Sequence, residues 1–191
     1  MQRSDIINKY YELSHLKDYF SKEIILWFVK NKRTLPWRTK ISQDNFSYLV
    51  LVSEFMLQQT QVKTVIPYFQ RFIAKWPSVQ LLAKAKDKEV LMFWQGLGYY
   101  SRGRNLLKSA KIIVSDYGGK IPVKEEELKK LPGVGDYTAA AIRSIAFNKK
   151  AVAIDGNVKR VIARFFGLEG TLESNLSVIE KIASLICPNS N

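Results

Sequence analysis

One glutamate lies inside an otherwise apolar stretch of the chain. Glu54 interrupts the run Tyr48-Leu-Val-Leu-Val-Ser-Glu-Phe-Met-Leu57, which is long enough for a buried helix. Burial of an unpaired carboxylate is costly and raises its pKa toward neutrality. Such a group holds a proton and gives it up, as a general acid must. The alternative interpretation is a glutamate on the solvent side of a helix.

A second carboxyl group precedes another predicted helix. Asp155 stands before Gly156-Asn-Val-Lys-Arg160, where an aspartate is a common N-cap. In a cleft, a capping aspartate can also present its carboxylate to a developing cation. One protonated and one ionised carboxyl group suit the cleavage of a glycosidic bond, because the leaving group needs a proton while the sugar carbon becomes an oxocarbenium ion. The sequence leaves the distance between the two groups open.

A turn built on two glycines follows a segment rich in Glu and Lys. The string is Leu131-Pro-Gly-Val-Gly-Asp-Tyr-Thr-Ala-Ala-Ala-Ile142. Gly133 and Gly135 permit a tight turn and let another molecule approach the backbone. The free N–H groups at the start of the next helix suit a phosphate. The pattern predicts a helix-hairpin-helix over about 125–147, a DNA-binding element, with an ordinary turn between helices as the alternative.

The composition favours a polyanionic partner. The 191 residues carry a net charge of +13, which points first to nucleic acid and second to an acidic membrane surface. No apolar run approaches the ~20 residues that span a bilayer, and the first residues lack the apolar core of a secretory signal. The single cysteine, Cys187, excludes a disulfide or Cys-rich metal site within the chain, and the single histidine, His15, disfavours His-based chemistry. A reducing, intracellular setting is expected.

The elements that must position these residues are all expected to be helices. Apolar side chains at a spacing of four, Leu16, Phe20, Ile24 and Phe28, predict an amphipathic helix over 16–31. Residues 32–46 are expected to form a loop. Further helices are predicted over 48–57, 62–75, 101–117, 157–166 and 173–186, with short ones beginning at the caps Ser78 and Asp87. No strand or repeat pattern stands out, so the sequence predicts an all-α protein.

Four motifs, in the expected order, resemble those of MutY-type adenine DNA glycosylases in the helix-hairpin-helix glycosylase superfamily. They are Ser53-Glu-Phe-Met-Leu-Gln-Gln-Thr-Gln-Val62, Trp94-Gln-Gly-Leu-Gly-Tyr-Tyr100, the glycine turn, and Asp155-Gly-Asn-Val-Lys-Arg160. The resemblance runs from about Trp27 to the end of the chain. It implies two helical lobes with the DNA and active-site cleft between them. A six-helix lobe would cover 46–150, and a second lobe would combine 1–45 with 151–191.

The resemblance implies a role for each candidate residue. Glu54 would protonate adenine at N7 and later activate water, and Asp155 would stabilise and trap the oxocarbenium ion at C1′. Tyr137 and Asn157 would support this site. Gln59 and Tyr99 would wedge into the duplex, Trp37 and Arg38 would line the adenine pocket, and Gly133 and Gly135 would approach the DNA backbone. The phosphate contacts would be Arg102, Lys159, Arg104 and Arg160.

Less specific interpretations of these residues stay open. Gln59 could be a surface glutamine, Tyr99 a core aromatic, and Trp37 a loop anchor. The basic residues could be solvated charges.

The implied activity is hydrolytic removal of adenine paired with 8-oxoguanine or guanine in double-stranded DNA, by a monomer located in the cytoplasm at the nucleoid. Endonuclease III-type enzymes, which resemble this chain in fold, carry a lysine where Tyr137 stands. A lysine amine forms a Schiff base with the sugar and goes on to break the strand, whereas tyrosine does not. A monofunctional glycosylase is therefore expected rather than a glycosylase/lyase.

The chain departs from the family pattern in three respects. The loop between Trp37 and Ser53 is longer than expected, with Asn45-Phe46 in place of the usual Pro-Tyr. The family holds a 4Fe–4S cluster with four cysteines spaced C-x6-C-x2-C-x5-C. This chain has only Cys187, so no cofactor is expected in it. The C-terminal domain that recognises 8-oxoguanine is also absent. The chain is expected to be a fragment or a truncated protein with lower stability, and a catalytically impaired DNA-binding remnant is the alternative function.

Overall fold

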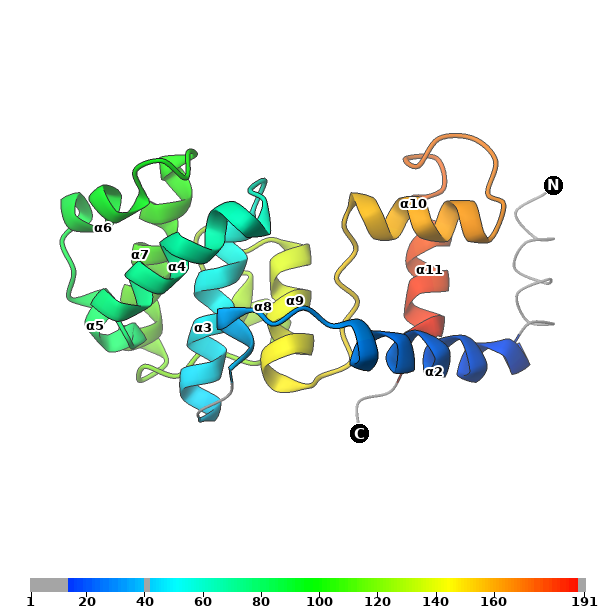
Figure 1. The fold of residues 1–191 in the computed structure, drawn as a ribbon, viewed down its shortest axis with the longest axis horizontal. Coiled ribbons are helices and arrows are strands. Elements are labelled where there is room, and N and C mark those ends of the chain that lie inside the picture. The colour runs from blue at the N-terminus through cyan, green and yellow to red at the C-terminus, as the bar shows by residue number, and fades with distance from the viewer. Residues whose placement is uncertain (1–13, 40–41, 189–191) are drawn as a thin grey trace. The chain divides into compact units, whose positions relative to one another are not determined.

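The computed structural model describes residues 14–39 and 42–188, and these residues form helices and loops with no β-strand (Figure 1). The all-α prediction is confirmed. The elements are α2 (Ser14–Asn31), the 3₁₀-helix η1 (Pro36–Arg38), α3 (Gln43–Leu57), α4 (Val62–Lys75), α5 (Val79–Ala83), α6 (Asp87–Trp94), α7 (Tyr100–Asp116), α8 (Glu125–Leu128), α9 (Asp136–Phe147), α10 (Gly156–Phe165) and α11 (Leu176–Ile186).

The chain divides into two compact units. The larger unit is Thr34–Lys149 and contains η1 and α3 to α9, while the smaller unit contains α2, α10 and α11. The N-terminal boundary lies at residue 33/34, not at the expected 45/46. The reason is that Leu35 and Trp37 are buried in the core of the larger unit, which makes η1 part of that unit.

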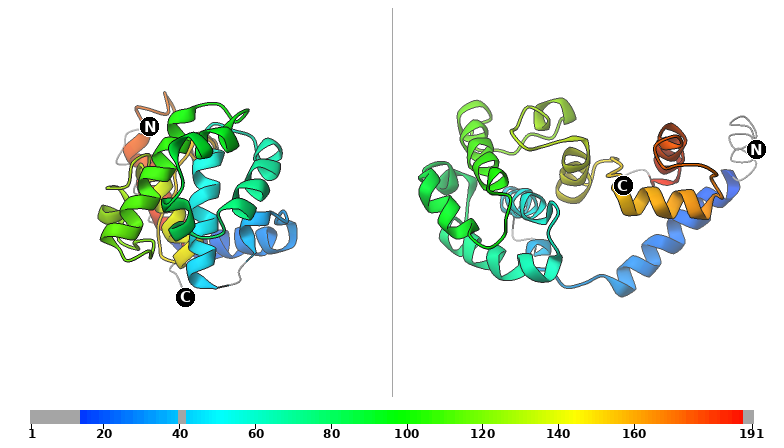
Figure 2. Two further views of the ribbon diagram at one scale, coloured as in Figure 1. Left: turned by 90° about the vertical axis from the view of Figure 1, so that its left-hand side faces the viewer. Right: turned by 90° about the horizontal axis from the view of Figure 1, so that it is seen from above.

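Helix α3 forms the centre of the larger unit. It packs against η1, α4, α7 and α9, and it lies among these elements in Figure 2. Leu51, Val52, Phe55 and Met56 have no exposed surface, so the helix is apolar on nearly all sides. This central position explains why the sequence shows a continuous apolar run and not a helical stripe.

The loop predicted over 32–46 is shorter in the structure. Ser42 caps α3, because its Oγ accepts a hydrogen bond of 3.2 Å from the backbone N–H of Asn45. Asn45 and Phe46 therefore lie in the first turn of α3, and Phe46 packs against the core. The predicted cap Ser78 is confirmed by its bond to Leu81 N at 3.3 Å.

Asp87 is not the cap of α6, because that helix begins one residue earlier than predicted. Lys86 holds the N-cap position, and its backbone N–H donates to Glu89 Oε2 at 3.0 Å. The acidic side chains of Asp87 and Glu89 lie in the first turn, where they complement the helix dipole.

The smaller unit has a modest core of its own. Ile162 of α10 packs with four buried residues of α11, namely Val178, Ile179, Ile182 and Ala183. Helix α2 joins them through the rings of Phe20 and Phe165, whose centroids are 5.1 Å apart. The predicted apolar stripe of α2 is only partly covered, because Ile24 is 50% exposed and Phe28 is 44% exposed. Leu16 lies in α2, but its side chain falls outside the described residues.

None of the helices in the described ranges combines the length and the apolar character needed to cross a membrane.

Candidate active site and nucleic-acid interface

Glu54 lies on α3 among the core residues of the larger unit. Its side chain is 8% exposed, and no other described residue forms a hydrogen bond or ion pair with its carboxyl group. Burial removes water from the carboxylate and raises the pKa of Glu54 to about 7. The group therefore carries a proton in much of the population near neutral pH, as the sequence predicted for a general acid.

The C-terminal end of α3 is tied to the glycine turn. Gln58 Nε2 donates to the carbonyl oxygen of Gly133 at 3.1 Å and lies 3.4 Å from Thr138 Oγ1. The helix that carries Glu54 is thus fixed to the hairpin across 75 residues of sequence. The sequence interpretation missed this role of Gln58, although an amide beside Gln59 in a Gln-Gln pair was a usable signal.

The two hairpin glycines have different roles. Gly133 has φ +83°, and a Cβ at this position would lie 2.8 Å from Phe55 Cε1 and 3.0 Å from Asn105 Cβ. Gly135 is extended, caps α9, and a Cβ there would contact nothing within 4 Å. Gly133 is therefore required by the fold itself, whereas the open space at Gly135 suits the approach of another molecule.

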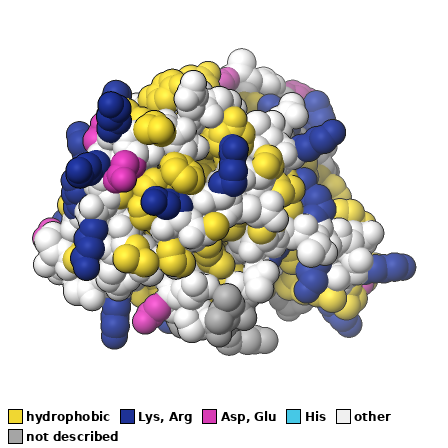
Figure 3. Space-filling model, turned by 60° about the vertical axis from the view of Figure 1, so that its left-hand side comes forward, with side chains coloured by type: hydrophobic (Ala, Val, Ile, Leu, Met, Phe, Trp, Pro, Cys, Tyr) yellow, Lys and Arg dark blue, Asp and Glu magenta, His cyan; other side chains and the backbone are white. Residues whose placement is uncertain are grey.

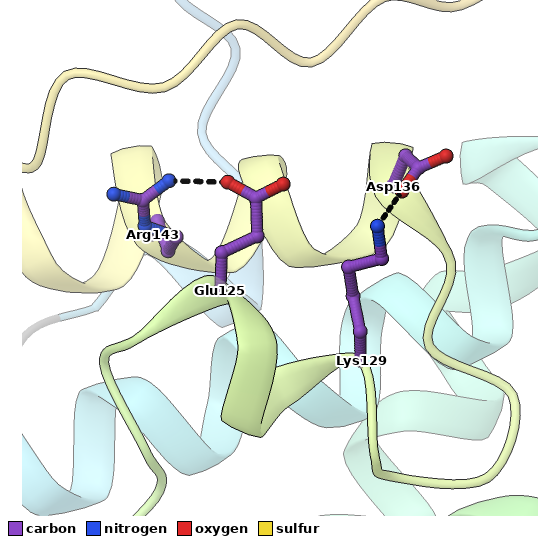
Figure 4. A network of polar contacts seen from close by, with 4 residues as sticks. All are labelled: Glu125, Lys129, Asp136 and Arg143. Atoms are coloured by element: carbon purple, nitrogen blue, oxygen red, sulfur yellow. Dashed lines mark hydrogen bonds and ion pairs between the residues drawn. The ribbon is translucent and has the colours of Figure 1, made fainter.

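Polar contacts hold the hairpin helices together (Figure 4). Arg143 Nη1 of α9 donates to Glu125 Oε2 of α8 at 2.7 Å, and Lys129 pairs with Asp136 at the start of α9. Tyr137 follows Asp136 in the first turn of α9 and is 42% exposed. Tyr137 thus lies at the surface on the first turn of α9, and the two ion pairs hold that helix against the residues of the preceding segment.

The hairpin is also anchored to α7. Ser109, which has no exposed surface, donates from Oγ to the carbonyl oxygen of Pro132 at 3.0 Å. Buried hydroxyl groups are normally satisfied in this way, and the bond fixes the residue just before Gly133.

Asp155 is the N-cap of α10, as the sequence predicted. Its Oδ1 accepts hydrogen bonds from the backbone N–H groups of Asn157 and Val158, at 2.9 and 2.8 Å. Its Oδ2 accepts from the side-chain amide of Asn157 at 2.9 Å. Arg160 in turn donates to Asn157 Oδ1 at 2.6 Å, which fixes the orientation of that amide. The predicted contact between Asn157 and the carboxylate is therefore present.

The two carboxyl groups belong to different units. Glu54 and Tyr137 are in the larger unit, whereas Asp155 and Asn157 are in the smaller one. Their action on one substrate stays a prediction.

Gln59 and Tyr99 share an unusual backbone conformation. Their φ angles are +57° and +48°, and within the described ranges only Asn148 is a further non-glycine residue with positive φ. Asparagine tolerates this region, whereas glutamine and tyrosine adopt it at a cost of about 1–3 kcal/mol. Tyr99 is 62% exposed, which excludes the core-aromatic interpretation. Both side chains stand at the surface on loops held in strained conformations.

The buried side chain of Arg102 does not lie at the surface, where a phosphate contact was expected. Its side chain is 6% exposed, and its guanidinium group donates to backbone carbonyl oxygens inside the larger unit. The sequence showed only a basic residue on a helix, and its burial depends on contacts from distant residues. Arg104, two residues later, is exposed and pairs with Asp87 at 3.8 Å. Lys159 of α10 is half-buried.

Trp37 is a core residue of the larger unit. It is 5% exposed and meets Phe69 edge to face, with ring centroids 5.3 Å apart. This is the contact that a loop anchor makes, and Arg38 beside it is exposed. The pocket role of both residues stays a prediction.

The residues of this chain do not fit an iron–sulfur cluster. Such clusters are held by four thiolate ligands, and Cys187 is the single cysteine. Within the described residues, no group of three or more His, Cys, Asp or Glu side chains could hold a metal ion.

The basic residues are spread over the surface. On the face shown in Figure 3, Lys and Arg side chains are numerous and acidic side chains are few. This distribution agrees with the net charge of +13.

The chain is similar in sequence to a known protein family and to several known proteins. Residues 52–188 match the model of a family described as HhH-GPD superfamily base excision DNA repair protein. The chain is 47% identical to an adenine DNA glycosylase of Rattus norvegicus over 165 residues, which cover 83% of this chain and 32% of the relative. It is 49% identical to that of Homo sapiens (76% and 28%) and 42% identical to that of Buchnera aphidicola from Acyrthosiphon pisum (82% and 44%). The chain thus spans less than half the length of these relatives.

Solved structures confirm the fold. A thermostable thymine-DNA glycosylase superposes with a TM-score of 0.77 and 29% identity, covering 91% of this chain and 79% of the other. A non-covalent endonuclease III–DNA complex gives a TM-score of 0.70 with 22% identity, covering 91% and 84%.

Proposed function

This chain belongs to the HhH-GPD superfamily of base excision DNA repair proteins, and we propose that it is a monofunctional adenine DNA glycosylase. Its substrate is adenine paired with 8-oxoguanine or guanine in double-stranded DNA. The observation that carries the proposal is Glu54, a buried carboxyl group with a pKa of about 7. The similarity to adenine DNA glycosylases supports the choice of base.

In the first step, the protonated Glu54 donates its proton to N7 of an adenine flipped out of the duplex. Flipping is needed because the glycosidic bond is not accessible inside the base stack. Protonation lets the C1′–N9 bond break with its electron pair leaving on adenine. The sugar is left as an oxocarbenium ion. A carboxyl group that stays protonated near neutral pH is suited to this role.

In the second step, the carboxylate of Asp155 stabilises the cation and forms a bond to C1′. Glu54, now ionised, takes a proton from water, and the water displaces Asp155 with overall retention of configuration. The contacts of Asp155 with Asn157 and with the start of α10 support a fixed carboxylate. The partial positive charge of a helix start favours an anion there.

The remaining candidates bind the DNA. Gln59 and Tyr99 enter the duplex, the backbone N–H groups beside Gly135 contact a phosphate, and Lys159 contacts another. Trp37 and Arg38 shape the adenine pocket. The protein acts as a monomer at the nucleoid.

The test is release of adenine from a labelled duplex with A opposite 8-oxoguanine, followed by alkali to break the strand at the abasic site. We expect strand breaks only after alkali. Glu54→Gln should reduce the rate by about 10²–10⁴-fold. Undiminished activity of Glu54→Gln would contradict the acid assignment, and breaks without alkali would indicate a glycosylase/lyase instead.

A DNA-binding remnant without activity is the second candidate. It is favoured by the net charge of +13, which attracts a duplex whether or not adenine is released. Salt-dependent duplex binding with no release of adenine from either mispair would establish it.

A further inference from the structure

Arg102 of α7 donates hydrogen bonds to the C-terminal end of α3 and to the turn before α7. From Nη1 it reaches the carbonyl oxygens of Phe55 (3.3 Å), Met56 (2.8 Å) and Gln58. From Nη2 it reaches the carbonyl oxygens of Leu97 (2.9 Å) and Gly98 (3.0 Å). One cation on α7 therefore joins the turn before that helix to the end of α3, whose bonded carbonyl groups lie 44–47 residues before Arg102 in the sequence.

The bonded carbonyl groups lie next to the two strained residues. Gln58 directly precedes Gln59, and Gly98 directly precedes Tyr99. The C=O of each preceding residue belongs to the peptide plane whose N–H belongs to the strained residue. A carbonyl held inward by Arg102 therefore fixes the peptide plane from which the positive φ of Gln59 or Tyr99 departs.

The chemistry of the contact requires a guanidinium group. Its terminal nitrogens carry donors in a fixed planar fork, so one side reaches the end of α3 and the other reaches the turn before α7. The cation also lies 5.4 Å from the ring centroid of Tyr99 and 5.8 Å from that of Trp94. A lysine ammonium keeps the charge but, as a single nitrogen on a flexible stem, does not reproduce the fork.

We propose that Arg102 is a positioning residue that holds Gln59 and Tyr99 in their strained conformations and sets the spacing between them. It acts from inside the larger unit and does not contact DNA. The part of this inference that concerns DNA rests on the proposed function, in which both residues enter the duplex. The part that concerns the loops rests on the hydrogen bonds alone.

The first experiment uses the DNA-free protein. Hydrogen–deuterium exchange compares the wild type with Arg102→Lys and with the control Lys111→Met, an exposed charge on the same helix. We expect faster exchange in Arg102→Lys at 58–61 and 96–100 together, with unchanged exchange in α5. Lys111→Met should match the wild type. Unchanged exchange at either loop in Arg102→Lys would overturn the proposal.

The second experiment tests whether Arg102 acts through the loop residues. Single-turnover adenine release is measured for Arg102→Lys, for the pair Gln59→Ala and Tyr99→Ala, and for all three together. We expect Arg102→Lys to lose about 10²-fold, the scale of a small misplacement in an active site. Adding it to the loop variants should cause little further loss. Full additivity would mean that Arg102 acts independently of both residues.

A second variant separates a general folding defect from the loss of the positioning role. Arg102→Gln, which is neutral and reaches one loop at a time, replaces Arg102→Lys if the lysine variant does not melt cooperatively. Failure of both variants to fold would overturn the proposal, because it would assign Arg102 to the fold as a whole. If the wild type releases no adenine, the proposed function fails, while the exchange experiment still decides the role of Arg102.

Discussion

At the scale of single residues, the two carboxyl groups have opposite surroundings. Glu54 lies among apolar side chains, and no described residue donates to it. Asp155 lies at a helix start and accepts three N–H donors. Desolvation favours the neutral acid at the first position, whereas the second carboxyl group accepts hydrogen bonds from donors of its own helix. This contrast is the arrangement that a proton donor and a cation stabiliser need.

Glu54→Gln should change how stability depends on pH. The pKa of Glu54 rises from 4.5 to about 7 in the folded protein, so the folded state binds more protons than the unfolded state between these values. The contribution of the protonated Glu54 side chain to the free energy of unfolding is fully present below pH 4.5 and is lost as the pH rises through 7. The advantage of Glu54→Gln over the wild type should therefore grow by about 3 kcal/mol across this window. Urea unfolding of both proteins from pH 4.5 to 8 measures this difference, and a constant difference would contradict burial of the acid.

Variants of Asp155 should separate capping from catalysis. Asp155→Asn keeps an oxygen that accepts from the start of α10, so its melting temperature should stay near that of the wild type. Asp155→Ala should lose about 1 kcal/mol of stability through loss of the cap. Both should lose adenine release. Differential scanning calorimetry with the alkali assay measures the two effects, and an active Asp155→Asn would show that Asp155 is only a cap.

At the scale of elements, the hairpin joins α3, α7, α8 and α9. Gln58 and Ser109 bond to its carbonyl groups, and the Arg143–Glu125 pair holds its helices together. These contacts fix the turn to its neighbouring helices, which reduces the conformational entropy that the turn would lose on binding DNA.

Alanine substitution of the two hairpin glycines should give opposite results. Gly133→Ala should be destabilising by more than about 1 kcal/mol, because φ is +83° and the new methyl group would lie 2.8 Å from the ring of Phe55. Gly135→Ala should leave the melting temperature unchanged, because its methyl group points into open space. It should weaken duplex binding, because the methyl group would stand where the DNA backbone is proposed to approach. Thermal melting and fluorescence anisotropy with labelled duplex measure both. Equal losses of stability would contradict this division of roles.

Much of the element order could be read from the sequence. The apolar run containing Glu54, the end of α9 at Phe147 and the cap at Ser78 follow from local patterns that the structure confirms. The burial of Arg102 could not be read, because it comes from contacts with residues far along the chain. Local sequence shows residue types, whereas the burial of a polar side chain is set by tertiary packing.

At the scale of the whole molecule, the net charge of +13 dominates the interaction with a polyanion. The chain has 30 Lys and Arg residues and 17 Asp and Glu residues, so the attraction to a polyanion does not depend on a single patch. Specific contacts add to this general attraction, and salt separates the two.

Duplex affinity should fall steeply with added salt, and Lys159→Gln should lower the slope of log K against log [salt] by about 1 if Lys159 neutralises one phosphate. Lys181→Gln, which removes an exposed charge from α11, is the control and should leave the slope unchanged. Fluorescence anisotropy between 50 and 200 mM salt, roughly the range over which such binding weakens, is the measurement. Identical slopes for Lys159→Gln and the wild type would remove Lys159 from the interface.

In the proposed mechanism, the position of Asp155 as a helix cap would give the covalent intermediate an internal source of instability. When the carboxylate forms an ester with the sugar, it loses its full negative charge and becomes a weaker acceptor for the N–H groups of Asn157 and Val158. The first turn of α10 is then less well capped, by up to about 2 kcal/mol. Hydrolysis of the ester restores the cap. Restoration of the cap would thus favour release of the enzyme from its own adduct.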